Sequence, residues 1–244
     1  DNTLPYMPTS AFNKVKKNNT ILKSTKKKIF LFPHCYLDAP HRYRWMIFDD
    51  FYKQMKFFLD QSKKLKNCQF YYKPHPNELK WSRQVHSLIL KDYPSVIRLK
   101  KNFSHQSVVK SKPALIVTNH GTIAHEFAAC KIPVLNTGDN PHINYKFCLH
   151  AKNKIEILKV LNNLNEEASK INYNLNDLFE YMYMRYRHFV YLNEEDKYLK
   201  DSFFAYKNIA INKTSKCLDK SILLSSKNRN KIKNYVTNFI KKNF

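Results

Sequence analysis

The sequence is almost free of glycine. Gly121 and Gly138 are the only two glycines in 244 residues, and both lie in one stretch, VTNHGTIAHEFAACKIPVLNTGDNPH, residues 117–142. Because glycine has no Cβ atom, it allows a sharp turn of the backbone or the close approach of a ligand. A chain that avoids glycine elsewhere is expected to use this stretch for one of those purposes.

Long apolar segments are absent as well. No apolar run reaches the roughly 18 residues that a membrane span requires. The first twenty residues, DNTLPYMPTSAFNKVKKNNT, lack the apolar core of a signal peptide. The sequence therefore predicts a cytoplasmic protein. Its first residue is Asp rather than Met, which leads us to expect further sequence upstream.

Cysteine pairs and complete metal motifs are missing. The five cysteines are odd in number and show no paired short spacing, which excludes a disulfide framework and a zinc ribbon. HEFAA begins like the zinc motif H-E-x-x-H but has Ala129 where the second histidine must stand. The remaining histidines lie among basic residues, which favours anions over a metal ion. We therefore predict no metal and no cofactor.

Acidic residues are scarce, since 19 Asp and Glu stand against 43 Lys and Arg, for a formal net charge of +24. Such a balance attracts phosphates, nucleic acid or an anionic membrane surface. The basic residues are scattered along the chain, however, and a coding bias toward Lys, Asn, Ile, Phe and Tyr gives the same composition. Charge alone therefore leaves the class of partner open.

The order of apolar segments predicts an α/β fold. Residues 1–27 are polar and carry Pro5 and Pro8, as is typical of a linker or arm. In residues 28–152, short runs rich in Ile, Val, Phe and Tyr alternate with segments of helical periodicity. This alternation predicts a Rossmann-like parallel sheet with helices on both faces. Residues 153–244 predict a helical C-terminal extension.

The glycine stretch has the layout of a ligand-binding strand end. ALIVT predicts a buried strand, NHGT a turn, and IAHEFAACK a short helix with His125 roughly opposite its apolar face. In an open parallel sheet, ligands bind at the carboxyl ends of the strands. Gly121 would allow a sharp turn there, so that a phosphate could approach the start of the helix beside the Thr122 hydroxyl. Glu126 would accept hydrogen bonds from sugar hydroxyls.

A second strand end carries a histidine between two prolines. In CQFYYKPHPNE, Pro74 and Pro76 fix φ and push the residues before them toward extended conformations, so His75 is expected on a stiff loop. A rigid histidine beside Lys73 suits a phosphate leaving group, either as a charged hydrogen-bond donor or as a general acid. This loop is therefore a candidate catalytic element.

A third strand end, FPHCYLDAPHRYRW, follows the first predicted strand. The further polar residues at the second and third strand ends are Asn77, Glu78, His34, Asp38, His41, Arg42 and Arg44. Because the carboxyl ends of parallel strands share one edge of a sheet, we predict that these loops and the two glycine loops open onto one cleft. The strands in question end at Phe32, Tyr72, Val117 and Leu135. The residues expected around the cleft are His34, His75, Gly121 and Gly138.

Taken together, KPHPNE and TNHGTIAHEFAACKIPVLNTGDNPH resemble the donor-binding, C-terminal half of GT-B glycosyltransferases of bacterial capsule and surface polysaccharide synthesis. The pattern is similar to that of Kdo transferases and, in its His-Pro pair, to that of bacterial sialyltransferases. The same general pattern occurs in glycerophosphotransferases that use CDP-glycerol. The resemblance runs from about Lys28 to His150. GT-B enzymes have two Rossmann-like domains and this chain has residues for one, so we expect the acceptor domain to be missing here.

The resemblance implies roles for individual residues. His75 is implied as the catalytic residue, which contacts the nucleotide phosphate and assists its departure. Glu126 would bind the ribose or the transferred sugar, and the loop of Gly138 would close over the donor. The implied donor-binding residues are Lys73, His34, Asn119, His120, Gly121, Thr122, Glu126, Gly138 and Asp139, with Asn140 and His142 near the donor.

Several functions remain open. The first is transfer of a sugar from a CMP-activated donor to a glycan or lipid-linked acceptor, by an enzyme in the cytoplasm or peripheral at the inner face of the membrane. The alternatives are a CDP-glycerol-type glycerophosphotransferase, a non-catalytic scaffold of capsule assembly and a nucleic-acid-binding module. The last is suggested by charge and aromatic content but has no recognisable DNA or RNA motif, so we predict no nucleic-acid partner.

Overall fold

The computed structural model describes residues 21–34, 36, 46–75 and 78–183. The described chain falls into two compact units, one that runs to Asn174 and one that begins at Leu175. Of the second unit, only the helix α7 (Leu175–Tyr183) is described. Residues 1–20 of the predicted N-terminal arm, residues 184–244 of the predicted C-terminal extension, and Asp38, His41, Arg42, Arg44 and Asn77 lie outside the described residues.

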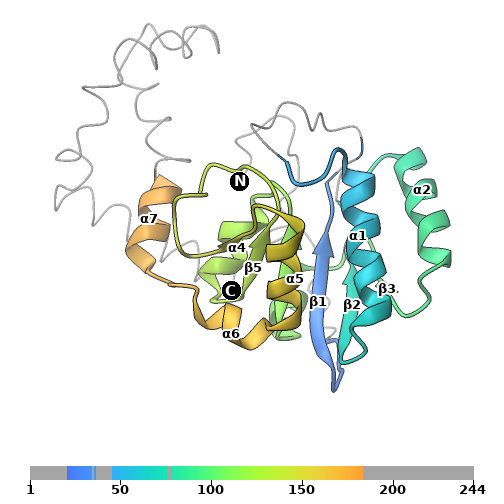
Figure 1. The fold of residues 1–244 in the computed structure, drawn as a ribbon, viewed down its shortest axis with the longest axis horizontal. Helices are drawn as coiled ribbons and strands as arrows, with labels where there is room; N and C mark the ends of the chain where they lie inside the picture. Colours follow the sequence, from blue (N-terminus) through green and yellow to red (C-terminus); the bar gives the residue numbers. More distant parts are fainter. Residues whose placement is uncertain (1–20, 35, 37–45, 76–77, 184–244) are drawn as a thin grey trace, which may run out of the picture. The chain divides into compact units, whose positions relative to one another are not determined.

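A six-stranded sheet forms the centre of the first unit (Figure 1). Its strands are β1 (Lys27–Phe32), β2 (Cys68–Tyr72), β3 (Ile97–Arg98), β4 (Leu115–Thr118), β5 (Val134–Asn136) and β6 (Leu149–His150). They lie in the order β3-β2-β1-β4-β5-β6, and every neighbouring pair is parallel. This is the strand order of doubly wound dinucleotide-binding folds. The predicted α/β, Rossmann-like class is therefore confirmed.

Helices cover both faces of the sheet, as predicted. They are α1 (Phe51–Lys64), α2 (Lys80–Lys91), α3 (His105–Lys110), α4 (Ile123–Ala129), α5 (Lys154–Asn162) and α6 (Leu164–Ser169). In Figure 1, α1 and α5 lie in front of the sheet and α4 lies behind it. The helices α5 and α6, which follow the predicted domain boundary at residue 152, belong to the same compact unit as the sheet. No helix among the described residues is long and apolar enough to cross a bilayer.

The two-residue period of the strands divides the core into two halves. Ile29 and Leu31 of β1 share a buried cluster with Phe58 of α1 and Ile157 of α5. The alternate residue Phe32 packs edge-on against Phe127 of α4, with ring centroids 5.5 Å apart. Each face of β1 is therefore sealed by a different set of helices, which explains why this strand is apolar at every position from Ile29 onward.

Two short elements were not predicted from the sequence. The strand β6 has two residues, and the helix α3 has six. Segments of this length are too short to show a period of 2.0 or 3.6 residues, so they leave no signal in the pattern of apolar residues.

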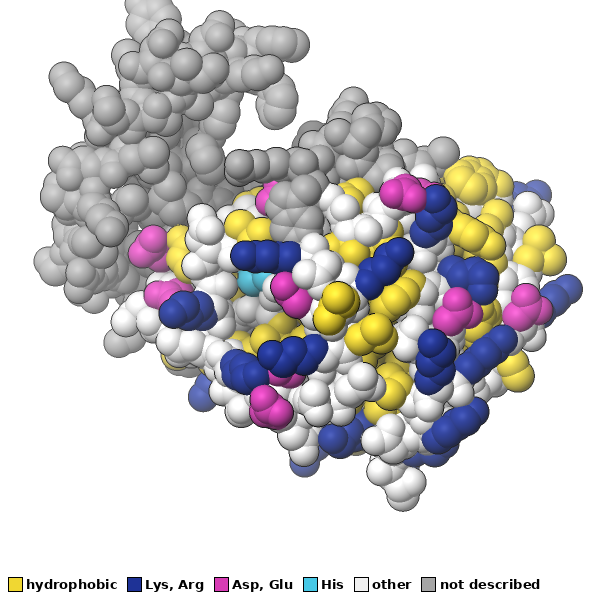
Figure 2. Space-filling model, in the orientation of Figure 1, with side chains coloured by type: hydrophobic (Ala, Val, Ile, Leu, Met, Phe, Trp, Pro, Cys, Tyr) yellow, Lys and Arg dark blue, Asp and Glu magenta, His cyan; other side chains and the backbone are white. Residues whose placement is uncertain are grey.

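The surface of the molecule is basic but has no continuous basic stripe on the face that Figure 2 shows. There, Lys and Arg side chains are spread among acidic, apolar and uncharged residues. Several form exposed ion pairs at helical spacing, as Lys53 does with Asp49 and Lys56 with Asp60. This distribution is typical of a solvated surface.

Helix α1 is fixed at its start by Asp50, and this end matters because Phe51 supports the site described below. The Asp50 carboxylate accepts a hydrogen bond from the Lys53 backbone N–H at 2.6 Å. Asp50→Ala removes this acceptor, and we expect it to lower the free energy of unfolding by about 1 kcal/mol. Urea unfolding followed by circular dichroism measures the loss.

Asp49→Ala is the matched control, because Asp49 is exposed and its carboxylate bonds the Lys53 side chain. Exposed ion pairs contribute little to stability, so this variant should unfold almost as the wild type does. Equal losses for the two variants would contradict the capping role of Asp50.

Candidate functional site

The candidate site lies where the strand order reverses. Strand β1 pairs with β2 on one side and with β4 on the other, so the loops that leave β1 and β4 diverge and open a crevice at the carboxyl edge. A small pocket occupies this position, lined by Phe32, Phe51, Tyr72 and Thr118 among others. All the loops singled out in the sequence start at this edge.

Three histidines from three different loops meet at the carboxyl edge of the sheet, next to this pocket but not among the residues that line it. The ring centroid of His34 lies 6.4 Å from that of His75 and 6.4 Å from that of His120. The His34 ring also stacks on Phe51, the first residue of α1, at a centroid distance of 5.0 Å. All three histidines are partly exposed. The structure thus brings together side chains that are far apart in the sequence, as the parallel arrangement predicts.

The loops after β4 and β5 are also joined. A ring nitrogen of His120 contacts the backbone oxygen of Asp139. Asn119 is buried against Gly138, and the Asn140 side chain donates to the Gly138 carbonyl at 3.1 Å. The two glycine loops therefore form one connected wall of the crevice.

The structure gives the two glycines a reason that the sequence did not show. Neither has a positive φ, so neither position requires the left-handed backbone that favours glycine, and the approach of a phosphate at Gly121 stays a prediction. Both glycines instead permit close packing of polar side chains. A Cβ atom at Gly121 would lie 2.9 Å from Thr118 Oγ1, and one at Gly138 would lie 2.4 Å from Asn119 Oδ1. At these two positions the loops are packed so closely that a residue with a Cβ atom would not fit without a shift of its neighbours.

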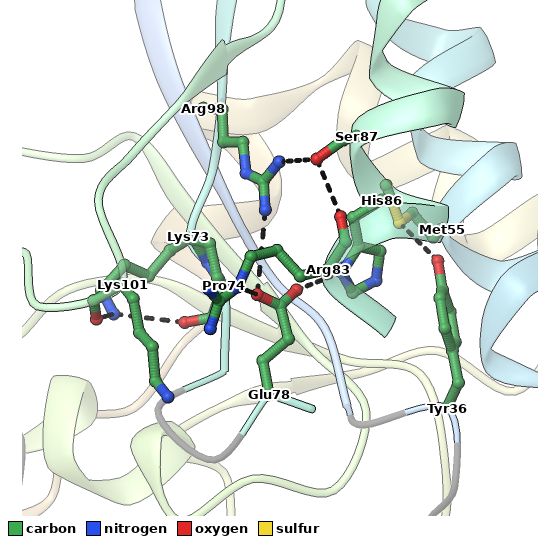
Figure 3. A network of polar contacts seen from close by, with 10 residues as sticks. All are labelled: Tyr36, Met55, Lys73, Pro74, Glu78, Arg83, His86, Ser87, Arg98 and Lys101. Carbon is green, nitrogen blue, oxygen red and sulfur yellow. Dashed lines mark hydrogen bonds and ion pairs between the residues drawn. The ribbon is translucent and has the colours of Figure 1, made fainter. Parts of the chain in front are cut away.

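Lys73 lies beneath the loops rather than on their surface (Figure 3). The residue is 2% exposed, and its ammonium group donates to the carbonyl of Lys101 at 2.8 Å and to that of Pro74 at 3.3 Å. Burial, reinforced by the nearby charge of Lys101, lowers the pKa of Lys73 to about 8. Lys73 therefore ties the end of β2 to the loop after β3, and its binding to a donor stays a prediction.

Glu126 and His105 form a pair that the sequence did not reveal. The Glu126 carboxylate lies 3.7 Å from His105 Nδ1, at the start of α3. Burial raises the pKa of Glu126, but the interaction with His105, helped by His125 and Thr122, outweighs it and holds the pKa below its ordinary value. The carboxylate is therefore ionised at neutral pH. Burial lowers the pKa of His105.

His105 escaped prediction because α3 was not recognised. The signal that could have found it is Ser104, whose hydroxyl accepts a hydrogen bond from the Ser107 N–H and caps the helix. A serine before a short polar-apolar segment is a helix-start signal, although a weak one.

His125 lies elsewhere than expected, whereas the place of His142 near the donor stays a prediction. His125 was expected opposite the apolar face of α4, and His142 near the donor. Both are buried, at 1% and 2% exposure. The His125 ring lies 6.2 Å from that of His142, which also packs against Phe147 and His150. The segment between β5 and β6 covers the side of α4 that looked polar, so these histidines belong to the core around that helix.

Comparisons with known proteins give fold neighbours only. No protein-family model matches the chain, and no curated protein matches it. Among solved structures, it is similar to a protein of Listeria monocytogenes assigned as a UDP-N-acetylglucosamine 2-epimerase, at 20% identity and a TM-score of 0.44, over 60% of this chain and 39% of that one.

Two other solved structures show similar likeness. The wall teichoic acid polymerase TagF has 14% identity and a TM-score of 0.42, over 70% of this chain and 42% of that one. KpsC of Thermosulfurimonas dismutans, a beta Kdo 2,4 transferase, has 17% identity and a TM-score of 0.38, over 58% of this chain and 42% of that one. This chain thus spans less than half the length of each of the three proteins.

The glycine contacts make a prediction with an internal control. Gly138→Ala places a methyl group within 2.4 Å of the buried Asn119 side chain, so we expect a loss of about 1–3 kcal/mol in the free energy of unfolding. Gly121→Ala meets its nearest atom at 2.9 Å and should cost less. Urea unfolding of the two variants tests the order, and a greater loss for Gly121→Ala would show that the Gly138 contact is not the tighter one.

The buried lysine predicts a specific dependence of stability on pH. The pKa of Lys73 is about 8 in the folded protein against an ordinary value of 10.5. Between these values the unfolded chain binds more protons, so the contribution of this group to stability rises with pH. We expect the free energy of unfolding of the wild type, relative to that of Lys73→Met, to increase by roughly 1–3 kcal/mol from pH 7 to 10.5.

Denaturant unfolding at a series of pH values measures this difference. Lys152→Met is the control, because Lys152 is exposed and its replacement should leave the difference flat. A flat difference for Lys73→Met as well would show that the Lys73 ammonium is not destabilised by burial.

Proposed function

We propose that this chain is the donor-binding half of a glycosyltransferase that transfers a sugar from a CMP-activated donor to a bacterial capsule or surface polysaccharide. The observation that carries the proposal is the convergence of His34, His75 and His120 at the point where the strand order reverses. Crevices at this position bind ligands in open α/β sheets. Three histidines suit a ligand that bears phosphate, since imidazole donates hydrogen bonds and carries charge when protonated.

We assign to His75 the role of stabilising the phosphate that leaves with the nucleotide. When the bond between the sugar carbon and the phosphate oxygen breaks, its electron pair stays on that oxygen. A hydrogen bond or a proton from His75 stabilises the charge that develops there. Because His75 is partly exposed and flanked by His34, its ring can reach a ligand in the crevice.

We assign to Glu126 the role of accepting hydrogen bonds from the hydroxyl groups of the nucleotide-sugar donor. Glu126 stands four residues after Thr122, on the first turn of α4, and its low pKa keeps the carboxylate ionised. An ionised carboxylate accepts strong hydrogen bonds from hydroxyl groups. His105 Nδ1 lies 3.7 Å from this carboxylate, so an ion-pair partner is in place before a ligand binds.

The remaining donor contacts belong to the loops that the structure joins. Asn119, Gly121 and Thr122 line the turn after β4, and Gly138 and Asp139 line the loop after β5. A glycosyl or lipid-linked acceptor would be bound by a second domain, because the GT-B enzymes that the sequence resembles have two Rossmann-like domains. A lipid-linked acceptor would place the enzyme at the inner face of the membrane.

A CDP-glycerol-type glycerophosphotransferase is the second candidate. It would use the same crevice, because its reaction also expels CMP. There the acceptor hydroxyl attacks the β-phosphorus of CDP-glycerol, and the bond from that phosphorus to the bridging oxygen breaks, which leaves the electron pair on CMP. The sequence resemblance covers both types of enzyme, and the joined loops after β4 and β5 suit either donor. A non-catalytic scaffold that binds nucleotide without turnover is the third candidate.

Replacement of His75 tests its catalytic role, and a panel of donors separates the candidate reactions. In the full-length protein, His75→Ala should lower the release of CMP by roughly 10²- to 10⁴-fold and leave the thermal unfolding midpoint almost unchanged, because a loop histidine adds little to the core. The assay follows CMP release from CMP-Kdo, CMP-N-acetylneuraminic acid and CDP-glycerol, and the donor that is consumed identifies the reaction. Glu126→Gln should instead act mainly on donor affinity.

Nucleotide binding provides the control for this assay. CMP or CDP should raise the thermal unfolding midpoint more than AMP or GMP, because a ligand that binds only the folded state stabilises it. Protection by CMP without turnover of any donor would favour the scaffold. Equal shifts with all four nucleotides would indicate phosphate attraction alone, and strong, salt-sensitive protection by random RNA would favour a nucleic-acid-binding module.

A further inference from the structure

A buried acidic residue stands directly after the His75 loop. Glu78 is 5% exposed, although it belongs to a polar connection between β2 and α2. Burying a carboxylate is costly unless it is paired and hydrogen-bonded. A surface loop does not require such a residue, so its presence calls for a local reason.

Three cationic or protonatable side chains surround the Glu78 carboxylate (Figure 3). His86 Nδ1 bonds one carboxylate oxygen directly. The other oxygen lies 3.6 Å from Arg83 Nε and 3.8 Å from an Arg98 guanidinium nitrogen. Arg98 also donates to the Ser87 hydroxyl, which completes a network between the loop, α2 and β3.

The histidine of this network is held in place by aromatic rings. The His86 ring lies 4.4 Å from that of Tyr36 and 5.0 Å from that of Tyr72, measured between centroids. Burial lowers the pKa of His86, an effect that the contact with Glu78 only partly offsets. A neutral ring that donates its Nδ1 proton to the carboxylate fits this environment. The carboxylate thus has a rigid partner.

The network reaches His75 through the backbone. The Glu78 N–H donates to the His75 carbonyl at 3.0 Å, and on the other side the Lys73 N–H donates to the Leu31 carbonyl at 2.9 Å, which extends the sheet ladder. The Lys73 ammonium adds its two bonds to the carbonyls of Pro74 and Lys101. The backbone is therefore fixed by buried groups on both sides of His75.

We infer that Glu78, anchored by His86, Arg83 and Arg98, is a positioning residue that holds the His75 ring at the crevice. The inference rests on the proposed function, in which His75 stabilises the leaving phosphate. A misplacement of about 1 Å at a reacting group can cost on the order of 10²-fold in rate. An ionic anchor at the end of the loop prevents such a displacement without touching the ligand.

The test is a double-mutant comparison in the full-length protein. Glu78→Gln keeps the size of the side chain but removes its charge. We expect it to lower kcat for CMP release by about 10- to 100-fold, with KM for the donor changed by less than about threefold. In a His75→Ala background the same change should have no further effect, because the two residues act as one unit.

Glu166→Gln is the matched control. Glu166 is exposed and pairs with the exposed Lys170, so this variant should behave as the wild type. An equal loss from Glu78→Gln in the wild-type and His75→Ala backgrounds would show a general structural role and overturn the inference, as would no loss at all. If Glu78→Gln does not fold, Arg98→Gln replaces it, with an expected loss of about 3- to 10-fold confined to the wild-type background.

A second measurement keeps this inference separate from the proposed function. If His75→Ala leaves CMP release unchanged, the catalytic role of His75 fails, but the positioning of its ring can still be tested by NMR of the imidazole signals. Glu78→Gln should shift or broaden the His75 signals, whereas Glu166→Gln should leave them as they are. Unchanged His75 signals in a folded Glu78→Gln protein would overturn the inference.

Discussion

The pairing of β1 with β2 on one side and with β4 on the other is the interaction on which the rest of the structure depends. It aligns the carboxyl ends of three strands, and because the chain leaves β1 and β4 in opposite directions, it opens the crevice between their loops. The same strand is buried on both faces. A shift of β1 by one residue would exchange its two faces and separate His34 from His75 and His120.

Below the crevice, the protein buries charged groups where an apolar core would be simpler. Lys73 is held by backbone carbonyls, Glu78 lies against His86, and the partly buried Glu126 lies against the buried His105. Buried charges of this kind rarely add net stability compared with apolar packing. These three groups share a location, since each lies beside a loop at the carboxyl edge of the sheet. Deviations from the simplest core are expected where a site must be held in a defined geometry.

The two glycines fit this picture. Neither has a positive φ, so a left-handed backbone is not the reason for either glycine. They allow Thr118 and Asn119 to pack against the loops after β4 and β5 at distances that a Cβ atom would block. In a chain so poor in glycine, both stand where loops approach each other closely. Close packing of these two loops is the property that they provide.

The sequence by itself determined the alternation of strands and helices, the parallel sheet and the loops that carry His34, His75 and His120. Periodicity and the strand-end rule suffice for these, because both depend on residues close together in the chain. Only the tertiary structure decided that Lys73, His125 and His142 are buried, and that His105 lies beside Glu126. The face that a short helix such as α4 presents to solvent depends on which distant segment covers it. Here the segment before β6 supplies that cover, and no local pattern records it.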